Sequence, residues 1–405
     1  MLIVQKYGGS SVADNERIFR AARRIIDTYK QGNRVVVVLS AQGDTTDDLY
    51  EKAYAINPNA SKRELSMLLS TGEQQSVALM AMAIHSLGYP AVSLTGWQAG
   101  IYSTSIHVNA RINRIDCGRM QTELDKNNIV LIAGFQGVNR FGDITTLGRG
   151  ASDTTAAAIA AVLEADLCEI YTDVNGVYTA DPRVVKTARK IDAISFDEML
   201  ELASLGAKVL ATRSVEMAKK YHVKMVVRSS FTDDPGTIIK EECSVENTFI
   251  SGLAVDRDVA SISLIGLKDR PGIAFRIFSL LAKEKISVDI ILQSIGRDNT
   301  KDISFTVTKT DLEQSLAVLE AARDMIGFTN LSFSDNIAKL SVVGAGMASN
   351  PGVASKMFEA LSDCGVNITM ISTSEIKISV LIDAADADRA ANYVHDKFFA
   401  ENSIH

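Results

Sequence analysis

Five consecutive apolar residues, Val35–Leu39, constrain the fold of this chain more than any other feature. A strand without polar alternation is covered on both faces, as in a largely parallel sheet between two layers of helices. Residues 1–230 alternate such β-branched runs with helical patterns, and strands are predicted over Leu2–Lys6, Arg34–Ser40, Ala91–Thr95, Ile129–Phe135, Leu167–Thr172 and Lys224–Ser229. The sequence therefore predicts an α/β layer in this part of the chain.

Helix signals lie between the predicted strands. Apolar residues every three or four positions predict a helix over Asp14–Tyr29. Ser61 with Glu64, and Ser195 with Glu198, have the spacing of a capping box at a helix start. Both signals agree with helices that connect parallel strands.

An internal repeat follows a turn cluster at Asp233–Gly236 and a polar connector at Glu241–Thr248. A shift of 80 residues lays Gly266–Ser294 on Gly346–Ser374 without a gap, and eight of the 29 positions are identical. Each copy has the pattern of a strand, a Pro-Gly turn, an amphipathic helix and a strand. Because the two copies share one register, we favour two βαββαβ-like modules over a chance similarity.

Composition narrows the class of protein. The net charge of −7 argues against nucleic-acid binding, and no apolar run approaches the roughly 20 residues of a membrane helix. The four cysteines form no CxxC pair and no zinc spacing, and the N-terminus has no signal-peptide pattern. We expect a cytoplasmic protein that handles small molecules, with no nucleic-acid or membrane partner.

Three loops are candidates for binding an anion. Lys6–Ser11 places glycines between a strand and a helix, where backbone N–H groups can face a phosphate, although a plain turn has the same composition. Thr145–Thr155 opens an alanine-rich helix; capping by Ser152 or Asp153 is the alternative, but it leaves Arg149 unexplained. Tyr171–Arg183 is rich in turn formers and by composition is equally typical of a surface loop.

These loops resemble the aspartate kinase members of the amino-acid kinase family. The matching segments, in the family's order, are KYGGSSV, VVVVLSAQGDTTD, STGE, AGFQGV, TTLGRGASDTTA, EIYTDVNGVYTADPR and LGAKVL. The repeated PG(I/V)A units resemble the tandem ACT modules of the same enzymes. The resemblance implies an amino-acid kinase domain over residues 1–240, followed by ferredoxin-like α+β ACT modules over 250–335 and 336–405.

The resemblance also implies site residues, position by position. ATP would contact Lys6, Gly8, Gly9, Ser10, Thr172, Asp173, Tyr178, Arg183 and Lys208. L-Aspartate would contact Ser40, Thr46, Glu73, Arg149, Gly150, Ala151 and Ser152. Lys6, Lys208 and Asp153 would be catalytic, with the carboxylate orienting the two ammonium groups. Mg²⁺ would bridge the ATP phosphates, and no metal site made by the protein alone is expected.

Plain structural roles compete with some of these assignments. Glu73 lies in a helical stretch, where a solvated charge is the alternative to binding the substrate ammonium. Without the resemblance, Lys208 would be predicted to be a surface lysine. Pro271-Gly272 is equally typical of a tight turn. Ala151 stands where the family usually has Gly, so a methyl group must fit beside the bound substrate.

ACT modules imply binding of free amino acids, and lysine and threonine are the usual effectors of aspartate kinases. The matching residues are Asp269, Pro271, Gly272, Ala274, Ser287, Asp289 and Gln293 in the first unit, and Val353, Ala354, Asn367, Ile368, Ser374 and Glu375 in the second. Ser287 and Ala354 depart from the usual Asn and Thr, which leaves the identity of the effector open. ACT sheets commonly join between chains, so a homodimer or tetramer is expected. A shorter regulatory chain, as in some relatives, stays open.

The expected reaction makes 4-phospho-L-aspartate. Its acceptor is a carboxylate that is already ionised at neutral pH, so catalysis needs positioning and charge screening rather than a general base. Two alternatives remain: another carboxylate kinase of the same fold, and a non-catalytic amino-acid sensor. The sensor would need a damaged nucleotide site, whereas Lys6, Asp153, Asp173, Arg183 and Lys208 are all present.

Overall fold

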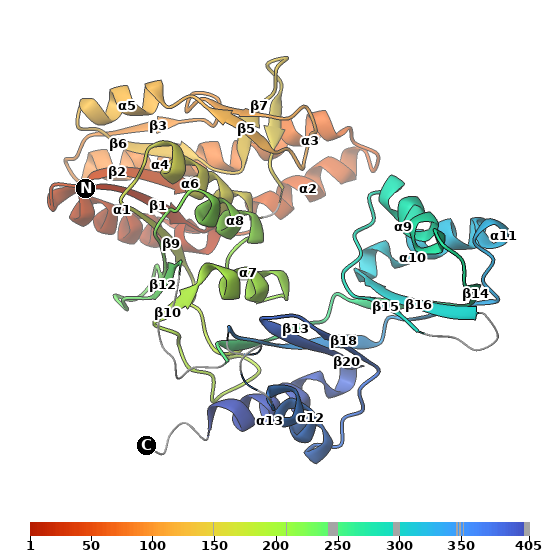
Figure 1. Ribbon diagram of the computed structural model, residues 1–405. Helices are drawn as coiled ribbons and strands as arrows, with labels where there is room; N and C mark the ends of the chain where they lie inside the picture. The colour runs from red at the N-terminus through yellow and green to blue at the C-terminus, as the bar shows by residue number, and fades with distance from the viewer. Residues whose placement is uncertain are drawn as a thin grey trace. The chain divides into compact units, whose positions relative to one another are not determined.

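The computed structural model describes residues 1–148, 150–207, 209–241, 250–294, 300–345, 347, 350 and 352–400. The chain forms two compact units. The first takes in Met1–Tyr178 and Lys190–Val245, and the second takes in Thr179–Arg189 and Glu246–His405 (Figure 1). Each unit has its own sheets and core.

The first unit is built on an eight-stranded sheet of order β10-β12-β11-β9-β1-β2-β6-β3. Its strands are β1 (Leu2–Tyr7), β2 (Arg34–Leu39), β3 (Ala91–Leu94), β6 (Ile129–Ala133), β9 (Leu167–Thr172), β10 (Ala193–Ser195), β11 (Met225–Ser229) and β12 (Thr237–Lys240). Every neighbouring pair is parallel except β11 with β12. The six predicted strands are confirmed, with ends shifted by at most two residues. The predicted α/β fold class is confirmed as well.

Helices cover both faces of this sheet. On one face, α1 (Asn15–Lys30) and α4 (Thr71–Ser86) pack on Tyr7, Val37 and Leu131 in one core cluster. On the other face, α6 (Ala151–Val162) contacts β1, β2 and β9, and α8 (Thr212–Lys220) packs against α6. The side chains of Val35–Leu39 are fully buried, so the absence of alternation did reflect a strand covered on both sides.

The remaining elements of the first unit surround this layer. They are the 3₁₀ helix η1 (Gly9–Val12), the helices α2 (Thr45–Ile56), α3 (Lys62–Leu69), α5 (Gly118–Asp125) and α7 (Phe196–Ser204), and the strands β4 (Ile101–Ser103), β5 (Ile112–Ile115), β7 (Gln136–Val138) and β8 (Ile144–Thr146). The last four form a separate sheet of order β5-β4-β7-β8. Ser61 and Ser195 cap α3 and α7 as predicted, and the Ser195–Glu198 capping box is complete.

The second unit contains two four-stranded antiparallel sheets, each with helices packed on it. One sheet has the order β15-β16-β14-β17, with β14 (Ala260–Lys268), β15 (Ile291–Gln293), β16 (Thr300–Val307) and β17 (Asn330–Ser334), and its helices are α9 (Ile273–Lys283), α10 (Lys309–Ala321) and α11 (Arg323–Ile326). The other has the order β13-β18-β20-β19, with β13 (Gly252–Asp256), β18 (Ile337–Val343), β19 (Met370–Thr373) and β20 (Lys377–Asp383), and its helices are α12 (Val353–Asp363), η2 (Ala384–Asp386) and α13 (Ala387–Phe399). The two sheets correspond to the two predicted modules.

The path of the chain differs from the expected division in two places. Strand β13 precedes the first repeat but pairs with β18, in the sheet of the second repeat. The segment Thr179–Arg189, expected within the kinase domain, belongs to the second unit. There Thr179 Oγ1 is hydrogen-bonded to Nε2 of the buried His395 at 2.9 Å, and the Thr179 carbonyl oxygen accepts from Leu253 N at 2.7 Å.

Among the helices of the described residues, none combines the length and the apolar composition of a membrane span.

Candidate active site

A cavity of about 590 Å³ lies where β1 and β2 end and α6 begins. Nine of the residues assigned from the sequence line it: Lys6, Gly9, Ser40, Thr46, Glu73, Gly150, Ala151, Ser152 and Asp153. They come from four separate stretches of the chain, at residues 6–9, 40–46, 73 and 150–153. The position is the expected one for an α/β sheet, whose ligands bind beyond the carboxyl ends of the strands.

Lys6 and Asp153 form an ion pair in this cavity. Lys6 lies near the end of β1, Asp153 lies in the first turn of α6, and Nζ is 2.6 Å from Oδ1. About a tenth of each side chain is exposed. The second carboxylate oxygen of Asp153 accepts a hydrogen bond from Ala211 N at 3.3 Å. The carboxylate is therefore fixed by the backbone and in turn holds the ammonium group at the cavity wall.

The glycine loop after β1 packs tightly against the loop after β2. A Cβ atom on Gly9 would lie 2.7 Å from the carbonyl oxygen of Ala41, so no larger residue fits without a shift of the backbone. The Gly9 carbonyl oxygen accepts from Gly43 N at 3.1 Å, and Gly8 N donates to the Tyr171 carbonyl oxygen at 3.2 Å. This loop therefore joins three strand ends, which a plain surface turn would not do.

Helix α6 begins at the cavity without a side-chain cap. Gly150 is the N-cap residue, with a φ of 71° that favours glycine, and no side chain of the described residues caps the helix. Ser152 and Asp153 lie inside the helix, so the alternative that one of them caps it is wrong. Ala151 N donates to the Gly148 carbonyl oxygen at 3.2 Å, and the positive end of the helix dipole favours an anion at this place.

Glu73 is a buried carboxylate that faces the same cavity from the first turn of α4. Its Oε1 accepts from Ala41 N at 3.2 Å, whereas Oε2 has no hydrogen-bond partner in the described part of the chain. Burial raises the pKa of Glu73 to about 8, and the hydrogen bonds from the backbone only partly oppose this shift. A solvated helix charge is thus excluded, and an incoming cation would stabilise the ionised form.

Ala151, the residue that replaces the usual glycine, has its methyl group in a small core. It is 2% exposed and belongs to a cluster with Leu49, Leu69, Phe135 and Leu147. It also lines the cavity. The extra methyl group is therefore packed against apolar side chains next to the site.

Other residues assigned to the nucleotide lie outside the lining of this cavity. They are Gly8, Ser10, Thr172, Asp173, Tyr178 and Arg183. Thr172 Oγ1 donates to Asp173 Oδ1 at 3.1 Å, and Arg183, in the second unit, pairs with Asp181 at 2.8 Å. Arg149 and Lys208 lie outside the described residues. Their assigned roles remain predictions.

Sequence reasoning missed other residues that line the cavity. Asp47 and Tyr50 come from α2, and Asn109 comes from the segment before β5. Gly148 approaches Asn109 so closely that a Cβ atom would lie 2.7 Å from Oδ1. Asp47 ends the matching segment VVVVLSAQGDTTD, which could have marked it, although no role was assigned to it. No local signal marked Tyr50 or Asn109, and the region around Asn109 has no periodicity.

The residues assigned to effectors lie at the expected elements of the second unit. Gly272 and Gly352 precede α9 and α12 with φ of 88° and 107°. Asp269 and Asp289 each pair with a lysine of the chain, Lys301 and Lys339, at 2.5 Å. Pro271, Ser287, Gln293, Asn367, Ser374 and Glu375 are exposed, and Ala274, Val353, Ala354 and Ile368 are partly buried. Both acidic groups are therefore already neutralised by the protein.

Comparison with known proteins agrees with this geometry. The model of the amino acid kinase family matches residues 1–229, and that of the ACT domain matches residues 262–322 and 340–398. The aspartokinase of Mycolicibacterium smegmatis is 51% identical over 403 residues, which cover 98% of this chain and 96% of that protein. The chain belongs to the aspartokinase family. The aspartokinase of Geobacillus stearothermophilus is likewise 51% identical over 398 residues, with 98% of this chain and 97% of that protein covered.

Solved aspartokinases have the same fold. E. coli aspartokinase III in complex with aspartate and ADP has a TM-score of 0.85 and 26% identity, covering 98% of this chain and all of that one. The same enzyme in complex with lysine and aspartate has a TM-score of 0.75 over 98% of this chain and 99% of that one, also at 26% identity. Both the family and the fold inferred from the sequence are confirmed, and this aspartokinase is an enzyme of the kinase class.

Proposed function

We propose that this aspartokinase transfers the γ-phosphoryl group of ATP to the side-chain carboxylate of L-aspartate and so forms 4-phospho-L-aspartate and ADP. The observation that carries the proposal is the cavity that both the Lys6–Asp153 ion pair and Glu73 face, where Glu73 Oε2 has no hydrogen-bond partner among the described residues. The first supplies a cation for phosphate, and the second supplies an anion for a substrate ammonium group.

Glu73 is proposed to bind the α-ammonium group of aspartate. Its Oε2 atom is buried without a hydrogen-bond partner in the described residues, and a partner there would offset the cost of ionisation. At pH 7 binding would release the proton that burial retains on Glu73. Ser40, Thr46 and Ser152 line the same cavity and would orient the substrate, with Arg149 predicted for its α-carboxylate.

Lys6 is proposed to act on the transferring phosphoryl group. Two anions must approach each other, and an ammonium group placed between them lowers the repulsion in the transition state. Asp153 holds Nζ in position, and the start of α6 adds N–H donors to the same wall. Lys208 is predicted to supply a second ammonium group. The acceptor carboxylate needs no general base.

ATP is proposed to lie against the loops after β1 and β9. The assigned residues there are Gly8, Gly9, Ser10, Thr172, Asp173 and Tyr178. Mg²⁺ is proposed to arrive with the nucleotide, because the described residues bring together no group of three or more His, Cys, Asp or Glu side chains. Magnesium usually keeps water and phosphate ligands, which fits this arrangement.

We further propose feedback control through the second unit by lysine, threonine or both. Structural support comes from the glycines that precede α9 and α12, from Asp269 before α9, and from Asp289 in the segment between α9 and β15. A homo-oligomer through the ACT sheets is proposed because β15 and β19 are edge strands with exposed Ile291 and Ile371. The product would enter the biosynthesis of lysine, threonine and methionine. The cytoplasm is the proposed compartment, because the cysteines of the described residues are free thiols.

The test is ADP release with Mg²⁺ and ATP across acidic acceptors, with trapping of the acyl phosphate by hydroxylamine. L-Aspartate should be phosphorylated, and N-acetyl-L-glutamate should not. Formation of an acyl phosphate from another acid but not from aspartate would support a different carboxylate kinase. Nucleotide or amino-acid binding without any ADP release would support the non-catalytic sensor.

A further inference from the structure

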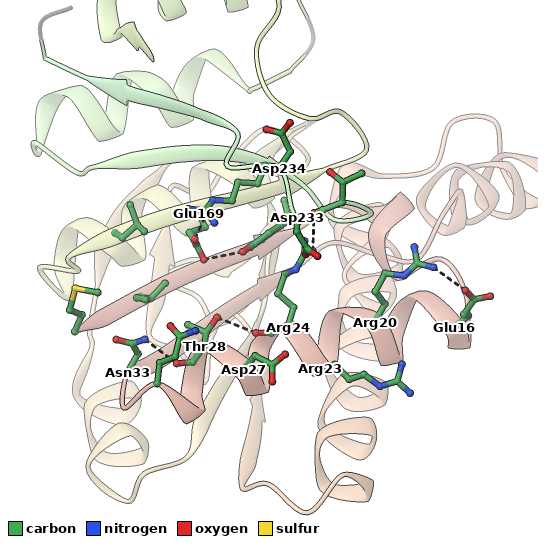
Figure 2. A pocket seen from close by; sticks show the side chains of 17 residues that line it. Glu16, Arg20, Arg23, Arg24, Asp27, Thr28, Asn33, Glu169, Asp233 and Asp234 are labelled. Atoms are coloured by element: carbon green, nitrogen blue, oxygen red, sulfur yellow. Dashed lines mark hydrogen bonds and ion pairs between the residues drawn. The ribbon is translucent and has the colours of Figure 1, made fainter. Parts of the chain in front are cut away.

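A second pocket of the first unit lies between α1 and β9, with a volume of about 700 Å³ (Figure 2). It shares no lining residue with the active-site cavity. Its walls are α1, which contributes Arg20, Arg23 and Arg24, and the loop Thr232–Asp234 after β11. Charged side chains in such a pocket can either bind a ligand or hold the loop Thr232–Asp234 in place.

Most of the charges in this pocket are paired with one another. Arg20 pairs with Glu16 at 2.9 Å, and Arg228 lies 3.5 Å from Glu169. Asp234 pairs with Lys190. The charged side chains of the lining therefore mainly stabilise the protein internally and do not form an open binding site.

Arg24 is the side chain that joins the two walls. Its guanidinium donates to the carbonyl oxygens of Ser229 at 2.8 Å and Thr232 at 2.9 Å, and to Asp233 Oδ1 at 2.7 Å. It also lies 5.2 Å from the centre of the Tyr171 ring, which stacks on Tyr7. Figure 2 shows Arg24 reaching from α1 toward Asp233, whereas Arg23 points away from it. Arg24 therefore fixes the loop that follows β11.

That loop is hydrogen-bonded to two of the nucleotide loops through Ser230. Ser230 N donates to the Thr172 carbonyl oxygen at 2.8 Å, and Ser230 Oγ donates to the same oxygen at 3.1 Å. Ser11 Oγ, next to the glycine loop, donates to Ser230 Oγ at 2.8 Å. Ser11 and Ser230 are buried. A displacement of the loop at Ser230 would therefore reach both sides of the proposed nucleotide site.

A second contact of α1 acts on the glycine loop directly. Arg17 Nη1 donates to the Ser10 carbonyl oxygen at 2.7 Å. The guanidinium carbons of Arg17 and Arg20 lie 5.3 and 5.6 Å from the centre of the Phe231 ring, which follows Ser230. Helix α1 thus holds the glycine loop and the loop after β11 together.

We propose that Arg24 is a positioning residue for the nucleotide, which acts through the loop 229–233 and Ser230 on Ser11 and Thr172. Arg24 does not line the active-site cavity. Its three hydrogen bonds go to Ser229, Thr232 and Asp233, none of which lines that cavity. The proposal rests on the proposed use of ATP. The contacts that Arg24 makes in the pocket between α1 and β9 would then set the distance between the glycine loop and the loop after β9.

The test compares Arg24→Gln and Ser230→Ala with Arg23→Gln in the full chain. Arg23 is the matched control because it lies next to Arg24 and lines the same pocket, yet it is exposed and makes no hydrogen bond or ion pair with the described residues. Arg24→Gln should raise the KM for ATP about tenfold and weaken MgADP binding in calorimetry to a similar degree. The KM for aspartate should change less than twofold. The double variant should be no worse than the poorer single one, because both act through one loop.

Three outcomes would overturn the proposal. They are an unchanged KM for ATP in Arg24→Gln, an equal rise in both KM values, and equal effects of Arg23→Gln. If Arg24→Gln does not fold, the milder Ser230→Ala variant decides through the same split between the two KM values. MgADP calorimetry separates this proposal from the proposed reaction, because nucleotide affinity is measured there without any acceptor.

Discussion

Lys6 and Asp153 are 147 positions apart in the chain, yet Lys6 Nζ lies 2.6 Å from Asp153 Oδ1. One side chain comes from the first strand and the other from the first turn of α6. The pair is mostly shielded from water, with 11% and 10% of the two side chains exposed. In such a place an ammonium group interacts with phosphate more strongly than it would in bulk water.

Replacement of Lys6 by Ala should lower kcat by about 10²- to 10³-fold, because a main stabiliser of the developing charge is lost. The measurement is steady-state ADP release at saturating ATP and aspartate. Lys62→Ala, which removes an exposed lysine at the start of α3, should leave kcat unchanged. A Lys6→Ala enzyme with the kcat of the parent would contradict the role assigned to Lys6.

The layered fold followed from local signals. Val35–Leu39 could be recognised as a doubly covered strand because burial on both faces leaves no polar alternation. Strand β13 could not be assigned in the same way, because pairing with β18 rather than β14 is decided by tertiary packing. The short strands β4, β5, β7 and β8 have only three or four residues each, too few to show a period.

The site was only partly accessible to sequence reasoning. The composition of the loops suggested anion binding, but only the resemblance connected Lys6 with Asp153. Burial of Glu73 was not visible either, since a carboxylate in the first turn of a helix is usually solvated. The contacts of Arg24 join stretches more than 200 positions apart, and no pattern along the chain records such a distance.

The KM for aspartate should depend on pH through Glu73. Burial raises the pKa of this carboxyl to about 8, so most of it is protonated at pH 6 and about half is ionised at pH 8. Only the ionised form pairs with the substrate ammonium group, whose charge is constant over this range. The KM should fall at least about fivefold from pH 6 to pH 8 in the parent enzyme. In Glu73→Gln it should be high and flat, and a parallel fall in that variant would sink the assignment.

The stability of the ligand-free protein should change with pH for the same reason. The pKa of Glu73 is about 8 in the folded protein and 4.5 ordinarily. Between these values the folded protein retains a proton that the unfolded chain has released. The free energy of unfolding should therefore fall as the pH rises from about 5 to about 8. Thermal melting of the parent and of Glu73→Gln measures this, and the variant should lose less of its Tm over that interval.

Effector binding should respond to the Lys301–Asp269 pair. Lys301 Nζ lies 2.5 Å from Asp269 Oδ1, and this carboxylate is the one proposed to bind the effector ammonium group. The Asp269 side chain is 60% exposed. An effector must compete with this internal ammonium group, whose side chain is 12% exposed; because the Asp269 carboxylate is open to water, the pair is worth only about 1 kcal/mol. Lys301→Gln should therefore tighten lysine or threonine binding by about twofold to fivefold in calorimetry. Lys283→Gln, which removes an exposed charge from α9 of the same module, should leave the affinity unchanged. Equal or weaker binding by Lys301→Gln would show that Asp269 does not receive the effector ammonium group.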